Sequence, residues 1–409
     1  MRYATLLCAF LTVAAMAGCD EKKKAAGAAE GTFGYDLKLL KEHTDVIVLS
    51  GAANKAQIAV VPAYQGRVMT STAEGDAGSS FGWINRELIA SGKTGPHMNA
   101  FGGEDRFWMG PEGGQFAIFF AKGKEFKFED WQTPAVIDTE PFDLVAKTAT
   151  EATFTKSTQL TNYSGTTFDV QIDRTVRLLD NAAMKAALGV DVPASVKAVT
   201  YESDNKITNK GDKPWVKETG LLSIWILGMF KPSDATTIVI PFEAGPEDEL
   251  GPKVNDAYFG KVPAERLVVK DDVLFFCGDG KYRSKIGLSP ARAKSVAGSY
   301  DAAGKVLTIV QYTKPEGAAD YVNSMWELQE APYAGDVINS YNDGPATPGA
   351  KPMGPFYELE TSSPAAALAP GESLSHVHRT FHLQGAEADL DPIAKSLLGV
   401  SLEEIKNAL

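Results

Sequence analysis

Histidine, cysteine, basic residues and recognisable catalytic motifs are scarce in this 409-residue chain, and each shortage excludes a class of protein. The five His and three Cys include no His-Glu-x-x-His or Cys-x-x-Cys spacing, so the usual zinc signatures are absent. There is no Walker loop, no Gly-x-Gly-x-x-Gly after a strand and no Gly-x-Ser-x-Gly elbow. Lys and Arg number 40 against 52 Asp and Glu, and a net charge of −12 gives no drive toward nucleic acid.

The first apolar run is short, follows a single Arg, and ends in Ala17-Gly18-Cys19. A charged start and small residues before a cleavage point are typical of an export signal. The ending resembles a bacterial lipobox, which predicts a lipoprotein signal peptide over residues 1–18 and lipidation at Cys19. An ordinary secretory signal with an incidental Cys is the alternative. Residues 19–39 are predicted to form a flexible tether.

These features predict an exported bacterial lipoprotein, in the periplasm or at the cell surface, that meets the membrane through its lipid. Of the three Cys, only Cys277 lies in the folded body, inside an apolar run. A buried, inert thiol is the expected state of that residue.

The body of the chain shows the pattern of short strands separated by turn residues. Phe168, Val170 and Ile172 alternate with polar residues, which is the period of a half-buried strand. The apolar run from Leu221 to Phe230 is typical of a strand that is covered on both faces. Further strands are predicted at residues 57–62, 115–120, 236–241, 305–312 and 356–361.

Helical spacing is clear only near the C-terminus, where Leu and Ile recur between residues 397 and 409 and Ser401 to Glu404 resembles a capping box. No repeat of fixed period occurs, and no internal linker is long enough to separate two domains. The sequence therefore predicts an all-β sandwich over residues 40–385, followed by a helical segment over residues 386–409.

A glycine-rich segment, residues 96–114, is the first candidate site. It carries His97, Arg106, Trp108 and Glu112 among five glycines, which allow backbone to approach a ligand closely. Aromatic faces with polar side chains suit a sugar, whose ring has apolar C–H faces and hydroxyl edges. The alternative is a long structural loop packed by its own aromatic residues.

Polar residues elsewhere are weaker candidates. Asn342 and Asp343 lie in an Asn-Asp-Gly-Pro segment that is either a plain turn or a binding loop. Arg174 falls on the apolar face of its strand, as a groove-lining donor or a rim residue with its stem along the sheet.

Three of the five His residues share one face of a predicted strand, because His376, His378 and His382 are separated by even numbers of residues. A metal site is conceivable there. No acidic residue or Cys is interleaved on that face, so a hydrogen-bonding face is predicted, with no metal and no cofactor.

The segment Leu359-Glu360-Thr361, followed by Leu368-Ala369-Pro370-Gly371-Glu372 and a closing strand, resembles the C-terminal end of aldose 1-epimerases (galactose mutarotases). The glycine-rich segment resembles the early sugar-binding loop of that superfamily, and the order of the pieces covers about residues 43–385. The chain looks closer still to an uncharacterised family of bacterial lipoproteins. This resemblance implies a galactose mutarotase-like β-supersandwich that binds a mono- or oligosaccharide in a groove.

The resemblance also implies roles for individual residues. Glu360 matches the catalytic base. The region 214–225 lacks the family's His, so the acid would come instead from His97, His378 or His376. The expected sugar-binding residues are Arg106, Trp108, Glu112, Arg174, Trp225, Asn342, Asp343, Glu358 and His376. A sugar enzyme of epimerase, mutarotase or lyase-like type and a non-catalytic carbohydrate-binding lipoprotein both stay open.

Glu358 and Glu360 share one face of their strand, and Tyr357, Leu359 and Thr361 share the other. An apolar face normally turns inward, which would leave the carboxyls in solvent. The resemblance predicts instead that they line the groove, where two carboxylates about 7 Å apart raise each other's pKa.

Overall fold

The computed structural model describes residues 28–51 and 55–409. The predicted signal peptide, Cys19 and most of the predicted tether lie outside the described residues. The tether was predicted to reach residue 39, but helix α1 (Phe33–His43) begins earlier and buries Phe33, Leu37 and Leu40 against the body. The tether boundary is corrected accordingly, because these apolar side chains give residues 33–43 a packed face.

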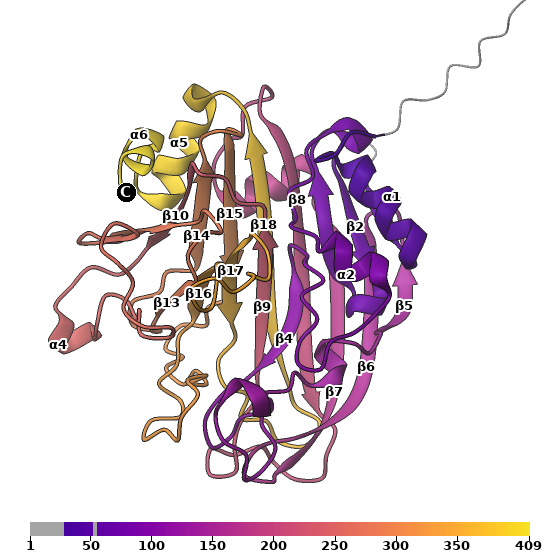
Figure 1. The fold of residues 1–409 in the computed structure, drawn as a ribbon, viewed down its shortest axis with the longest axis vertical. Helices are drawn as coiled ribbons and strands as arrows, with labels where there is room; N and C mark the ends of the chain where they lie inside the picture. The colour runs from indigo at the N-terminus through magenta and orange to yellow at the C-terminus, as the bar shows by residue number, and fades with distance from the viewer. Residues whose placement is uncertain (1–27, 52–54) are drawn as a thin grey trace, which may run out of the picture.

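The architecture consists of three antiparallel sheets of ten, five and three strands (Figure 1). In spatial order, the ten-stranded sheet contains β11 (Leu267–Val269), β12 (Val273–Cys277), β10 (Thr236–Pro241), β14 (Val296–Asp301), β15 (Val306–Tyr312), β18 (Ser373–Gln384), β8 (Lys197–Asn209), β7 (Thr167–Leu178), β6 (Glu151–Thr161) and β5 (Asp143–Lys147). The five-stranded sheet contains β13 (Ser284–Leu288), β16 (Ile338–Asn342), β17 (Tyr357–Ser362), β9 (Ser223–Phe230) and β4 (Arg106–Gly110). The small sheet contains β1 (Ile47–Ser50), β2 (Gln57–Val61) and β3 (Arg67–Thr72).

The remaining helices are short and lie at the periphery (Figure 1). They are α2 (Arg86–Ser91), α3 (Asn181–Leu188), α4 (Glu247–Leu250), α5 (Glu387–Leu398) and α6 (Leu402–Lys406). The predicted capping box is confirmed, since Ser401 and Glu404 exchange side-chain and backbone hydrogen bonds at the start of α6. No helix in the described part of the chain is long and apolar enough to cross a membrane.

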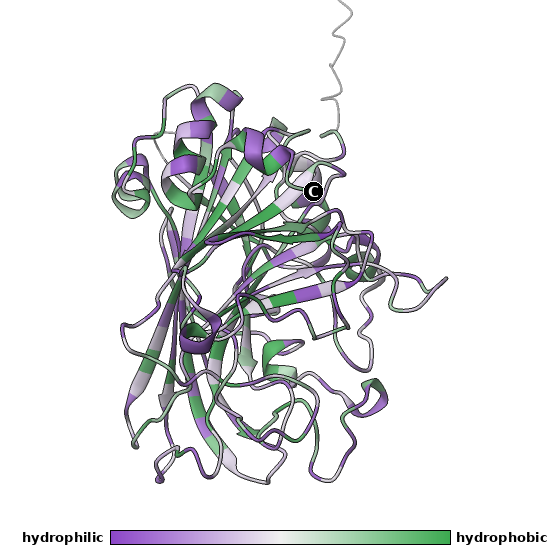
Figure 2. Ribbon diagram, turned by 90° about the vertical axis from the view of Figure 1, so that its left-hand side faces the viewer, coloured by the Kyte–Doolittle hydropathy of each residue, from purple (hydrophilic) through white to green (hydrophobic). Residues whose placement is uncertain are grey.

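One face of the five-stranded sheet packs against the ten-stranded sheet. Phe107, Ile224 and Ile226 meet Phe168 and Val170 in one buried apolar cluster. This layering follows from the alternation of the strands, which carry both hydrophobic and hydrophilic bands (Figure 2). We call the opposite face of the five-stranded sheet, which loops cover, the outer face.

Most predicted strands are confirmed, including β7 with its strict alternation and the doubly covered β9. The prediction of a strand at residues 115–120 is wrong. That segment is an irregular stretch whose residues 117–120 are buried against the aromatic cluster around Trp108 and Trp131. An apolar run indicates that a segment is buried, but the segment forms a β-strand only if its backbone pairs with a neighbouring strand.

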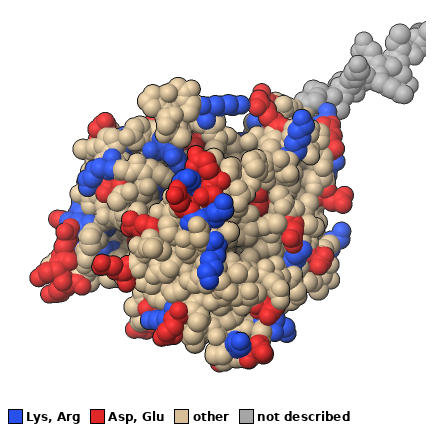
Figure 3. Space-filling model, turned by 60° about the horizontal axis from the view of Figure 1, so that its bottom comes forward, with Lys and Arg blue, Asp and Glu red and all other residues tan. Residues whose placement is uncertain are grey.

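Charged side chains of both signs are interspersed on the face seen in Figure 3. Wide uncharged areas lie between them. An acidic group gathers over the projecting helix α4, whose sequence is Glu-Asp-Glu-Leu. Basic side chains form no continuous stripe on this face.

Candidate functional site

The candidate site is built on the outer face by side chains from all five strands of the sheet. Register sets them side by side: Glu358 lies opposite Tyr341, and Tyr341 lies opposite Lys285. On the other flank of β17, Glu360 lies opposite Leu227, which lies opposite Arg106. The glutamates therefore face the covered groove and not the inter-sheet core, as the resemblance predicted.

Trp108 of β4 and Trp225 of β9 lie opposite each other on the same face, with ring centroids 5.5 Å apart. Both indoles are almost fully buried. They supply aromatic surface beside the carboxyl groups, the combination that a sugar ring requires.

Glu360 is fully buried and is held through one of its two oxygens. Its Oε2 accepts hydrogen bonds from Lys285 Nζ at 2.9 Å and from Trp225 Nε1 at 3.0 Å. The Lys285 ammonium also lies 4.7 Å from the centre of the Trp225 ring. Oε1 has no hydrogen-bond partner among the described side chains and backbone groups, so one lone-pair-bearing oxygen remains available.

Glu358 has different surroundings. Its Oε1 accepts a hydrogen bond from Arg106 Nη2 at 3.3 Å, and the same guanidinium lies 4.2 Å from the centre of the Trp108 ring. Burial raises the pKa of Glu358 to about 8; Arg106 opposes this rise, and the neighbouring Glu360 carboxyl adds to it. Two adjacent buried carboxyls resist ionising together, so Glu358 keeps its proton near neutral pH.

A third carboxyl, Glu112, follows β4 and completes the group. Burial raises its pKa, and the Lys285 ammonium opposes the rise. Its backbone N–H donates to Ser324 Oγ at 3.2 Å, which ties it to the long connection between β15 and β16. The site thus combines three carboxyls with two cations.

That connection, residues 313–337, covers one end of the outer face. Trp326 stacks on Trp131 at 5.8 Å, and a Cβ at Gly113 would overlap the backbone around Met325. The glycine at 113 therefore lets one chain segment approach another. This corrects the expectation that the glycines of residues 96–114 approach a ligand, because protein backbone already occupies the space at this position.

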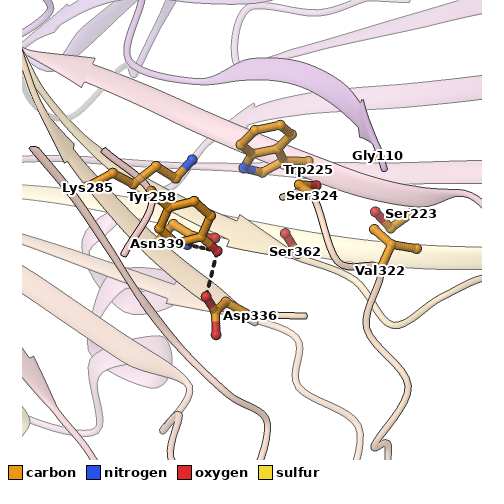
Figure 4. Close-up of a pocket in the computed structure, with 10 residues that line it drawn as sticks. All are labelled: Gly110, Ser223, Trp225, Tyr258, Lys285, Val322, Ser324, Asp336, Asn339 and Ser362. Carbon is orange, nitrogen blue, oxygen red and sulfur yellow. Dashed lines mark hydrogen bonds between the residues drawn. The ribbon is translucent and has the colours of Figure 1, made fainter. Parts of the chain in front are cut away.

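A small cavity lies beside Lys285 (Figure 4). On its wall Tyr258 donates a hydrogen bond to Asp336 Oδ2 at 2.6 Å, and Asn339 Nδ2 donates to the Tyr258 oxygen at 3.2 Å. The cavity volume is about 20 Å³, which is room for about one water molecule. A sugar ring would enter this part of the site only if the covering segments moved apart.

The structure does not bring His376 and His378 to this site. Both donate to or accept from Thr361 Oγ1 at 2.9 Å, between the two large sheets. Thr361 and Glu360 point to opposite faces of β17. His376 and His378 therefore do not contact the groove, contrary to the expectation from the sequence. His97 lies at the edge of the covering loops, where its Nδ1 is 2.6 Å from the Trp131 carbonyl oxygen.

Two further predicted binding residues are held by other parts of the protein. Arg174 is fully buried and pairs with Asp105 Oδ1 at 2.6 Å. It therefore lies neither in the groove nor at the rim of the sheet, the two positions expected from the sequence. Asn342 points away from the outer face and holds the 280–282 turn through Gly280 and Tyr282. Arg174 and Asn342 lie inward because their strand faces meet neighbouring protein and not the groove.

Asp343 follows β16 directly. It accepts hydrogen bonds from Tyr341 OH at 3.1 Å and from the Gly354 backbone at 2.6 Å. Because Tyr341 lies opposite Glu358, Asp343 stays near the group of carboxyls. The site residues brought together are therefore Arg106, Trp108, Glu112, Trp225, Glu358 and Glu360, with Asp343 at the margin.

Sequence reasoning missed Lys285, Tyr258 and Asp336. Lys285 alternates with Ile286 in a short apolar strand, and a lone charge in such a strand is a usable signal. Tyr258 and Asp336 lie in irregular segments about 80 residues apart, and nothing local marks them as partners.

A model of a family of unknown function, DUF6786, matches residues 31–409, and the chain belongs to that family. No curated protein matches the chain. The Slr1438 protein from Synechocystis sp. PCC 6803 is similar in fold, with a TM-score of 0.50 at 12% identity over 84% of this chain and 96% of that chain.

Two other solved structures are similar. A putative aldose 1-epimerase from Escherichia coli K12 has a TM-score of 0.47 at 12% identity, over 84% of this chain and 99% of that one. A galactose mutarotase-like protein from Lactobacillus casei ATCC 334 has a TM-score of 0.46 at 11% identity, over 83% and 100%. The predicted all-β fold class with mutarotase-like neighbours is confirmed, and the likeness concerns the fold alone.

Proposed function

We propose that this member of DUF6786 binds a sugar on the outer face of the five-stranded sheet and acts on it by acid–base chemistry of the aldose epimerase type. The observation that carries the proposal is the pair Glu358 and Glu360. The two carboxyls share one strand face, yet one binds a lysine and an indole N–H while burial keeps the proton on the other. Neighbouring carboxyls in different surroundings, one of which keeps its proton, are what a paired base and acid require.

In this proposal Glu360 is the base and Glu358 the acid. Glu360 takes the proton of the anomeric hydroxyl while Glu358 gives its proton to the ring oxygen, and the bond between the anomeric carbon and the ring oxygen breaks. The open-chain aldehyde then rotates and closes by the reverse proton transfers. Lys285 holds Glu360 in place, and Trp108 and Trp225 offer aromatic faces to the C–H groups of the ring.

A variant of the base tests the proposal. Glu360→Gln should abolish turnover while sugar binding stays within about tenfold, because the amide keeps the shape but takes no proton. Anomeric exchange by NMR and binding by calorimetry would be measured on a panel of monosaccharides. Glu151→Gln, which alters a partly exposed ion pair with Arg177, is the matched control and should leave both unchanged.

A non-catalytic carbohydrate-binding protein is the second candidate. The ion pair with Lys285 that already engages Glu360 favours it. Sugar binding without turnover in the natural protein would establish this alternative. Turnover that persists in Glu360→Gln would eliminate Glu360 as the base.

We also propose that the protein is exported and anchored through a lipid on Cys19. The sequence of residues 1–19 supports this proposal. Cys19→Ser should move the protein from the membrane fraction to the soluble fraction or leave it unprocessed. An unmodified N-terminus at another residue, found by mass analysis of the natural protein, would contradict the anchor.

A further inference from the structure

A strip of aromatic rings runs from the carboxyl pair to the surface of the molecule. Phe259, Tyr341, Phe356 and Trp83 form a chain of contacts, with successive ring centroids 5.9, 5.8 and 4.7 Å apart. Tyr341 is the strand neighbour of Glu358 on the outer face, about 5 Å away along the hydrogen-bonding direction of the sheet. The second ring of the strip therefore lies beside the proposed acid, and Phe259 is the next ring on one side.

The Phe259 end of this strip is open and carries a guanidinium. Phe259 is 45% exposed, so part of its ring is open to a ligand. The Arg283 guanidinium lies 3.9 Å from the centre of its ring, and Asp343 accepts the Tyr341 hydroxyl at 3.1 Å. An aromatic surface edged by a guanidinium presents partners for both C–H groups and hydroxyls.

We propose that this strip is a second sugar subsite, so that the ligand is an oligosaccharide. Its reducing-end ring occupies the position beside Glu360, and the next ring packs on Phe259, with hydroxyls directed to Arg283. The inference rests on the proposed function, because it takes the carboxyl pair as the first subsite. The adjacency of Tyr341 and Glu358 matches two rings joined by one glycosidic bond.

Paired ligands test the subsite. Glucose is compared with cellobiose and maltose, and galactose with galactobiose, by calorimetric titration and by anomeric exchange. In the natural protein at least one disaccharide should bind about tenfold more tightly than its monosaccharide. Phe259→Ala should remove that advantage, while the affinity for the monosaccharide and its rate of anomeric exchange change by less than about twofold.

Leu144→Ala is the matched control, because Leu144 is 42% exposed and lies on β5 at the far edge of the ten-stranded sheet. It should leave the affinity and the rate of anomeric exchange unchanged for every sugar tested. Monosaccharide turnover with no disaccharide advantage, or an advantage that survives Phe259→Ala, would overturn the subsite and leave the proposed function standing. Failure of every sugar to bind would overturn both.

Discussion

Glu358 and Glu360 are two residues apart and chemically identical, yet their carboxyl groups have different hydrogen-bond partners. Lys285 and Trp225 both donate hydrogen bonds to Glu360. Glu358 has a longer contact with Arg106, at 3.3 Å, and burial outweighs the effect of this cation on the pKa of Glu358. Position on the sheet, not residue type, distinguishes the two residues in the proposed roles of acid and base.

The Glu358 proton predicts a pH dependence. Because burial raises the pKa of Glu358 to about 8, turnover should fall as the pH rises through that value and the acid loses its proton. Glu358→Gln should lower turnover by about 100-fold or more and remove this alkaline fall from the residual activity. A pH–rate profile from pH 6 to 10 measures both.

Glu112→Gln is the comparison variant, because burial raises the pKa of Glu112 as well. It should keep the alkaline fall of the natural protein. If Glu112→Gln removes the fall and Glu358→Gln retains it, the acid role belongs to Glu112.

At the scale of the element, strand β18 carries polar side chains into the space between two sheets. His376, His378 and His382 are all buried on one of its faces. Thr361 Oγ1 is hydrogen-bonded to both His376 and His378. Glu104 Oε2 lies 3.0 Å from His382 Nε2. Buried groups of this kind are tolerated because they are paired and, for His376 and His378, uncharged.

Strand β18 therefore predicts acid sensitivity of the fold. Burial lowers the pKa of His376 to about 3 and that of His378 to about 4, so the unfolded chain binds more protons than the native one below about pH 6.5. The free energy of unfolding should fall as the pH drops from about 6.5 to 4, by about 1.4 kcal/mol per pH unit for each His. Urea unfolding at pH 7 and pH 5 measures the slope.

His378→Gln should reduce that slope by the contribution of one proton. His43→Gln, which alters an exposed His at the end of α1, should not change it. A natural slope near zero between pH 6 and 4.5 would show that these buried His residues do not control acid stability.

At the scale of the whole molecule, one buried carboxylate joins the three sheets. Glu104 accepts hydrogen bonds from Tyr201 of β8 at 2.8 Å and from the Ser71 backbone of β3 at 2.6 Å, and it lies two residues before β4. Helix α1 closes the small sheet, where Asp36 pairs with Arg86 at 2.7 Å. The N-terminal segment is therefore part of the packed body from residue 33 onward.

Truncation tests this extent of the body. A chain that begins at residue 28 should unfold at the same temperature as the full chain, because it keeps α1. A chain that begins at residue 45 loses three buried apolar side chains, which costs about 5 kcal/mol or more. Equal melting temperatures of the two shortened chains, measured by calorimetry, would contradict the packing of α1.

The sequence by itself determined the features that depend on local periodicity. The alternation along Tyr357–Ser362 placed Glu358 and Glu360 on one face, and the spacing at Ser401 and Glu404 marked a helix start. Most strands, and the all-β class, follow from the same period of two. These signals lie within a few residues of each other, so no tertiary information is needed to detect them.

Only the tertiary structure decided which faces meet. Lys285 and Glu360 are 75 residues apart and come together because β16 lies between β13 and β17. His378 has the same even spacing that made it a candidate, yet its strand belongs to the other sheet and faces the inner side of β17. Periodicity states which residues share a face, whereas strand order depends on long-range pairing that buries apolar area across the whole chain.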